Sequence, residues 1–168
     1  LELLAALPET PERTRHELAL QAILGPALIA TQGYAAPDVA YTYSRARELC
    51  RTLGDPPELF AVLFGQALWH TLRGQYQAAQ ELAEQLFRMA QQRHDLVSLV
   101  EAHVVLGTVL VTRGALEAGC THLEAGLTLY YPEQHRAHVD DYGQDPAVGC
   151  LDFLSQALWL RGYPHQAF

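Results

Sequence analysis

The stretch LRGQYQAA, residues 72–79, indicates the fold, because its glycine ends one apolar run and opens the next. Similar stretches recur as ATQGYAAP (30–37), VTRGALEAG (111–119) and WLRGYPHQA (159–167). Intervals of 41, 40 and 48 residues separate the four turn glycines Gly33, Gly74, Gly114 and Gly162. A period near 40 with helical sequence on both sides predicts stacked helical hairpins, since one such hairpin cannot bury its apolar face alone.

The apolar residues on both sides of Gly74, in 58–73 and 75–93, recur at intervals close to 3.6 residues. Prolines in Pro8-Glu9-Thr10-Pro11 and Gly54-Asp55-Pro56-Pro57 interrupt the pattern between pairs. The sequence therefore predicts an all-α fold, a right-handed superhelical solenoid of about three and a half hairpins in a single domain over residues 1–168. The expected hairpins cover about 14–53, 58–93, 98–130 and 146–168.

Small residues stand at fixed distances from the turn glycines. One lies seven positions before the glycine and another five after it: Gly107 and Gly119 around Gly114, Ala67 and Ala79 around Gly74, and Ser155 and Ala167 around Gly162. Tyr76 and Leu116 stand two after their glycines, where the last hairpin has Pro164. This spacing resembles the tetratricopeptide (TPR) family. The first hairpin departs most, because Asp38 takes the small-residue place; a one-residue insertion at the turn would put Val39 there.

The period near 40 exceeds the 34 residues of the TPR family. Longer hairpins of this kind resemble the helical tails of large bacterial signalling ATPases, among them the maltotriose-responsive transcription activators. ELALQAILGPALIATQGYAAP (17–37), ARELC (46–50) and YGQDPAVGCL (142–151) are especially similar to the tails of adenylate cyclase/ATPase fusions. The resemblance implies a region of a longer chain whose catalytic domains lie elsewhere. The first residue, Leu1, and the end at Phe168, where a fourth apolar run begins, predict such a piece as well.

The charge balance limits the partners that the chain can have. Eleven basic against nineteen acidic residues give a net charge of −8, which argues against binding nucleic acid or an anionic membrane. The longest uncharged apolar stretch, Leu59 to Leu72, is too short to span a membrane. Three widely separated cysteines, Cys50, Cys120 and Cys150, predict buried thiols in a reducing compartment, so the expected location is the cytoplasm.

The segment YPEQHRAHVDDYGQDP, residues 131–146, lengthens the third interval. We name it the insertion. If it were helical, two histidines followed by carboxylates could ligate a transition metal, and its candidate ligands are His135, His138, Asp140, Asp141 and Asp145. The alternative is a polar connecting loop with solvent-facing histidines, and a capping or partner-contacting role is favoured over metal chemistry because the catalytic zinc spacing is missing.

Two further histidines, His70 and His103, stand at packing positions of first helices. Either could be a catalytic base, but no serine or cysteine nucleophile shares their spacing. We therefore favour the interpretation that both are neutral imidazoles that fill the hairpin interior. The sequence therefore predicts no catalytic residues, no metal site and no cofactor.

The first helix of each hairpin lines the concave surface in TPR-like solenoids. The resemblance places exposed positions ten, six and three residues before the turn glycine, and these nine residues form the predicted groove: Phe64, Leu68, Thr71, Val104, Thr108, Val111, Asp152, Gln156 and Trp159. Apolar side chains on a concave face are typical anchors for a partner helix or peptide. The same residues could instead pack on an adjacent repeat.

Two functions follow from this reading. The first is a non-catalytic protein–protein interaction or scaffold module of a larger bacterial regulatory ATPase, which binds a peptide, a neighbouring domain or a second copy of the chain. The second is a small-ligand sensing domain that regulates an attached ATPase or cyclase, with Trp69 and Trp159 stacking on a sugar or nucleobase.

Overall fold

The computed structural model describes residues 8, 10–33, 35–135, 139 and 142–167. These residues form α-helices and one short 3₁₀ helix, and no strand occurs among them. The bounds are α2 (Pro11–Gln32), α3 (Pro37–Leu53), α4 (Leu59–Leu72), α5 (Tyr76–Arg93), α6 (Leu96–Thr112), α7 (Leu116–Leu129), α8 (Pro132–His135), α10 (Pro146–Leu160) and η1 (Pro164–Gln166). The prediction of an all-α fold is confirmed for the described residues.

Three of the four turn glycines, Gly74, Gly114 and Gly162, end their helices in one common way. At Gly74, the N–H of Gly74 donates to the carbonyl of Thr71 (3.0 Å) and the N–H of Gln75 to the carbonyl of His70 (2.9 Å). The same two bonds occur at Gly114 and Gly162. This Schellman motif needs a residue with positive φ, and the three glycines have φ of 72°, 91° and 86°. The recurrence of LRGQYQAA-like stretches therefore has a structural cause.

Two helices begin earlier than the periodicity predicts. The helix α2 starts at Pro11, where the hydroxyl of Thr10 accepts a hydrogen bond from the N–H of Arg13 (3.2 Å). The helix α6 starts at Leu96, because Oδ1 of Asp95 accepts from the backbone N–H of residues 97 and 98 (3.1 and 3.2 Å). Proline is tolerated in the first turn of a helix, so Pro11 begins α2 instead of separating it from the preceding segment.

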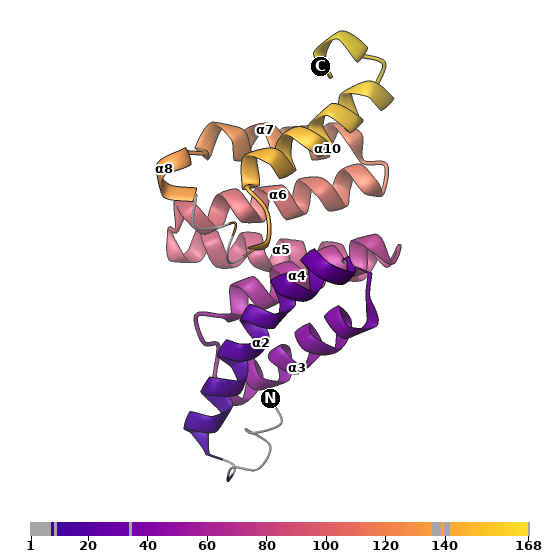
Figure 1. Ribbon diagram of the computed structural model, residues 1–168. Coiled ribbons are helices and arrows are strands. Elements are labelled where there is room, and N and C mark those ends of the chain that lie inside the picture. Colours follow the sequence, from indigo (N-terminus) through magenta and orange to yellow (C-terminus); the bar gives the residue numbers. More distant parts are fainter. Residues whose placement is uncertain (1–7, 9, 34, 136–138, 140–141, 168) are drawn as a thin grey trace.

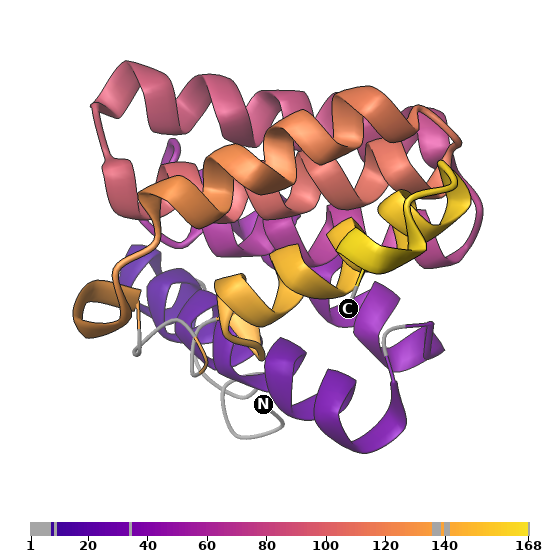
Figure 2. The ribbon, with the colours of Figure 1, turned by 90° about the horizontal axis from the view of Figure 1, so that it is seen from above.

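Consecutive helices pack against each other along the chain. In Figure 1 they stack in chain order, from α2 and α3 at one end to α7 and α10 at the other. Seen from above, α7 and α10 cross over the helices that precede them (Figure 2). One buried apolar cluster extends from α2 to α6, and a second joins α6, α7 and α10. The helix α6 belongs to both clusters and so connects the two halves of the core.

Small residues lie where paired helices cross closely. Gly107 of α6 faces Gly119 of α7, where a Cβ would lie 3.1 Å from the carbonyl oxygen of Gly107. Ala67 and Ala79, at the matching positions of α4 and α5, are completely buried. The small residues that carry the TPR resemblance are therefore buried in the pair α4 and α5, and in the pair α6 and α7 they lie at the close contact between the two helices.

Candidate functional site

A pocket of about 410 Å³ lies between α4, α6 and α10. Each of these helices is the first helix of an expected hairpin and ends at one of the three Schellman turns. Six of the nine predicted groove residues line the pocket: Leu68 and Thr71 from α4, Thr108 and Val111 from α6, and Asp152 and Gln156 from α10. The structure thus brings together two of the three predicted groove residues from each of these helices.

The pocket walls are mostly apolar. Leu72, Phe153 and Leu160 complete the lining together with polar groups of Thr112 and Gln144. The hydroxyls of two lining threonines are already bonded to backbone carbonyls, Thr71 to that of residue 67 (2.7 Å) and Thr112 to that of residue 108 (2.7 Å).

Two polar groups distinguish the pocket from an apolar hollow. The hydroxyl of Thr108 has no hydrogen-bond partner among the described residues. Asp152 is exposed and is the single charged side chain of the described lining. A ligand for this pocket therefore needs apolar surface and gains from one positive charge.

The expectation that the groove residues are exposed is wrong for six of them. Phe64, Leu68, Thr71, Val104, Thr108 and Val111 are buried, whereas Asp152, Gln156 and Trp159 are exposed. The reason is that α6 contacts both α4 and α10, so neighbouring helices cover part of one another's surface. Phe64 and Val104 are not among the residues that line the pocket, and Trp159 lines a neighbouring hollow of about 360 Å³ with Leu160.

The insertion covers the other end of the predicted groove. The ring of Tyr142 packs on the ring of Phe64, with centroids 4.7 Å apart, and edge-on to that of Phe60 at 6.3 Å. Gln144, two residues after Tyr142, lines the pocket. The amide of Gln144 and the side chain of Val104 both pack against Gly149 of α10. Residues of the insertion thus occupy the part of the surface that the sequence assigns to a partner.

The insertion does not form the hypothetical metal site in the part that the structure describes. His138, Asp140 and Asp141 lie outside the described residues. His135 is buried, with Nδ1 2.7 Å from the carbonyl oxygen and 3.1 Å from the nitrogen of Tyr131. The alternative of solvent-facing histidines is therefore wrong for His135.

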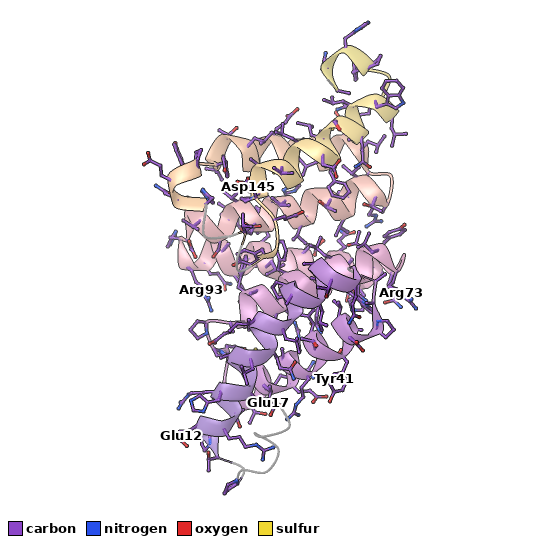
Figure 3. All side chains as sticks on the ribbon, in the orientation of Figure 1. Glu12, Glu17, Tyr41, Arg73, Arg93 and Asp145 are labelled. Carbon is purple, nitrogen blue, oxygen red and sulfur yellow. The ribbon has the colours of Figure 1, made fainter. Side chains whose placement is uncertain are left out.

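Asp145, the fifth hypothetical ligand, caps a helix. It stands at the start of α10 (Figure 3), where Oδ1 accepts from the N–H of Ala147 (2.8 Å) and Oδ2 accepts from the hydroxyl of Tyr130 (2.8 Å). Within the described ranges, no group of three or more His, Cys, Asp or Glu residues could hold a metal ion.

The two histidines of the first helices have different surroundings. His103 is buried on α6, and its Nδ1 lies 3.1 Å from Nδ1 of His122 on α7. Burial, together with the neighbouring His122, lowers the pKa of His103 to about 4, so the ring is neutral at pH 7. His70 is half-buried, and its Nδ1 lies 2.6 Å from Oε1 of Gln75. His103 is thus a neutral imidazole in the interior, as the sequence predicts, whereas His70 lines a surface cleft.

All three cysteines are buried and none forms a disulfide. Burial raises the pKa of Cys50 to about 11 and that of Cys150 to about 12. The thiolate is the reactive form of cysteine, so these two side chains are inert at neutral pH.

Searches against protein-family models, curated proteins and solved structures found no match to this chain. Among the residues that the structure describes, no helix has the length and apolar character that a membrane span requires.

Proposed function

We propose that the chain is a non-catalytic binding module, a TPR-like right-handed solenoid of helical hairpins within a larger bacterial signalling or regulatory ATPase. The pocket between α4, α6 and α10 holds a segment of a partner protein. The three matching Schellman turns and the small residues at the helix crossings support the repeat. No family match identifies the parent protein, so that part of the proposal rests on the sequence resemblance.

One observation carries the proposal: the pocket is built from neighbouring turns of three successive first helices. A site shared by several repeats is how solenoids recognise extended partners. Its volume of about 410 Å³ accommodates one or two apolar side chains. Because Asp152 is the charged group of the described lining and the whole chain carries −8, the partner segment presents an apolar residue beside a lysine or arginine.

A display library of random peptides, selected on the 168-residue chain, tests this function. We expect enrichment of peptides that combine a bulky apolar residue with lysine or arginine. Asp152→Lys should weaken their binding about tenfold or more, since it places two like charges together. The Kd values are measured by fluorescence anisotropy with labelled peptides.

Glu124→Lys is the matched control, because Glu124 is exposed on α7, is absent from the pocket lining and gives the same change of charge. Peptides with lysine replaced by glutamate should regain affinity for Asp152→Lys. Failure to enrich any peptide, or equal weakening by the two variants, would contradict the proposal.

A small-ligand sensing domain is the second candidate, because a volume of about 410 Å³ also suits a small molecule. The tryptophans do not form the proposed stacking site in this pocket: Trp69 lies against His70 and Arg73, and Trp159 lines the neighbouring hollow. A thermal-shift screen of sugars and nucleosides should then find a compound that raises the Tm of the wild type. Gln156→Trp, which fills the pocket from an exposed position, should abolish that shift. A screen without any hit would count against this candidate.

A further inference from the structure

A second cleft, of about 460 Å³, lies between α3 and α5 with α4 beneath it. Unlike the pocket described above, its lining is mainly polar. The side chains that matter are Ser44, Arg47 and Arg51 of α3, Gln66 and His70 of α4, and Gln85 of α5. The proposed function makes no use of any of them.

Two arginines of this cleft, Arg47 and Arg51, stand four positions apart on one face of α3 and both line the cavity. Like charges at this spacing destabilise a helix. In the described part of the chain neither guanidinium has a carboxylate within ion-pair distance; the recorded ion pairs are those of Arg45 and Arg88.

Two carboxylates, Glu48 and Glu81, also line the cleft, and each is hydrogen-bonded to another side chain. Glu48 accepts from Nη1 of Arg45 (3.3 Å), and Glu81 accepts from Nε2 of Gln77 (2.9 Å). Asp55 raises the pKa of Arg47 from a distance but forms no ion pair with it. Neither carboxylate forms an ion pair with Arg47 or Arg51, so both guanidinium groups remain available to an anion.

Arg47 is held there at an energetic cost. Its Nη1 is buried without a hydrogen-bond partner, and Nη2 reaches only Oε1 of Gln85, at 3.5 Å. Burial first, and then the charge of Arg51, lower the pKa of Arg47. Arg47 as a whole is half-buried, but a buried N–H group without a hydrogen-bond partner destabilises the folded state, and such groups gather at binding sites. An anion placed between the two arginines would remove this cost.

We propose that the cleft between α3 and α5 binds the phosphate group of a small organic phosphate. The two guanidinium groups contact its oxygens, a geometry for which arginine is well suited. The amide of Gln85 and the ring of His70 flank the anion. The remaining volume, bounded by Ala78 and Leu82, holds the organic part. This site is separate from the pocket between α4, α6 and α10, so the phosphate proposal and the proposed function can each be disproved independently of the other.

Isothermal titration of the 168-residue chain with inorganic phosphate, pyrophosphate and ADP tests the site. We expect binding of at least one of them, with citrate at the same ionic strength much weaker. Arg47→Gln and Arg51→Gln should each weaken this binding about tenfold or more. Arg88→Gln, which removes the same charge from an exposed position on α5, should leave the Kd unchanged.

The melting temperature without ligand provides a second readout. If Arg47 had a purely structural role, its replacement would lower the Tm. Arg47→Gln instead removes a buried N–H group without a partner and the repulsion from Arg51, so the Tm should be unchanged or higher. Arg51 is exposed, so Arg51→Gln tests binding even if the first variant folds poorly. No binding at about 10 mM phosphate compound, equal stabilisation by citrate, or equal weakening by Arg88→Gln would overturn the proposal.

Discussion

Gly119→Ala is expected to destabilise the protein by about 2 kcal/mol, although the same change in an unpacked helix is stabilising by up to about 1 kcal/mol. The new Cβ would lie 2.6 Å from Cγ2 of Val111, 3.0 Å from the nitrogen of Val111 and 3.1 Å from the carbonyl oxygen of Gly107. Two of these three atoms belong to the backbone of α6. The substitution can be accommodated only if α6 and α7 move apart along a buried contact.

Chemical denaturation followed by circular dichroism measures this effect, and the Tm should fall by about 4–8 °C. Val111→Ala removes one of the three close contacts and should not restore stability to Gly119→Ala, since both backbone contacts remain. Ala118→Gly, at the exposed neighbouring position, reports the helix propensity alone. A Gly119→Ala protein as stable as the wild type would show that the two helices are not in the close contact described here.

The turns and helices could be predicted from the sequence because their causes are local. A glycine with positive φ, an apolar period of 3.6 and a flanking proline act over a few residues, so Gly74, Gly114 and Gly162 identify their turns reliably. Gly33 is the exception. Its N–H bonds to the carbonyl of Ile29 in a different turn, and the buried residue after it is Val39, as a one-residue insertion requires.

The candidate pocket could be predicted only in part, because exposure depends on segments that are distant in the chain. Position relative to the turn glycine indicates which side of α4 and α6 faces α10, and Leu68 and Thr108 accordingly line the pocket. It does not indicate that Tyr142, 78 residues beyond Phe64, packs over that side chain. The sequence of residues 140–145, DDYGQD, contains no signal for this contact.

The arginine cleft shows the same limit. The spacing of Arg47 and Arg51 is visible in the sequence, but an arginine pair four residues apart on a helix is ordinary when carboxylates face it. What distinguishes the pair is that Glu48 is bonded to Arg45 and Glu81 to Gln77. Both hydrogen bonds are local to one helix, whereas the cleft that the two arginines line depends on how α3, α4 and α5 pack, which no local pattern encodes.

Acidification from pH 6.5 to pH 4 is expected to reduce the free energy of unfolding by about 2–3 kcal/mol through the pair of His103 and His122. Burial lowers the pKa of both rings, and the pKa of His103 falls to about 4. The ring of Phe87 packs at nearly a right angle to both rings, and His103 is buried while His122 is half-buried, so little water is available to stabilise a positive charge on His103. In the unfolded chain the pKa of histidine is about 6.5. Between these values the unfolded state binds a proton that the folded state does not, so stability is complete above pH 6.5 and decreases as the pH falls.

Urea denaturation at a series of pH values measures this loss, and His103→Leu should remove most of it while keeping the buried position apolar. His16→Gln is the control, since His16 is exposed on α2 and its replacement should leave the pH profile unchanged. Glu17, whose pKa is lowered chiefly by its hydrogen bond to Arg45, adds its own loss only as the pH falls below about 4.5. The two contributions therefore occupy different pH ranges. A wild-type profile that is flat between pH 6.5 and pH 5 would mean that the pair accepts a proton in the folded state.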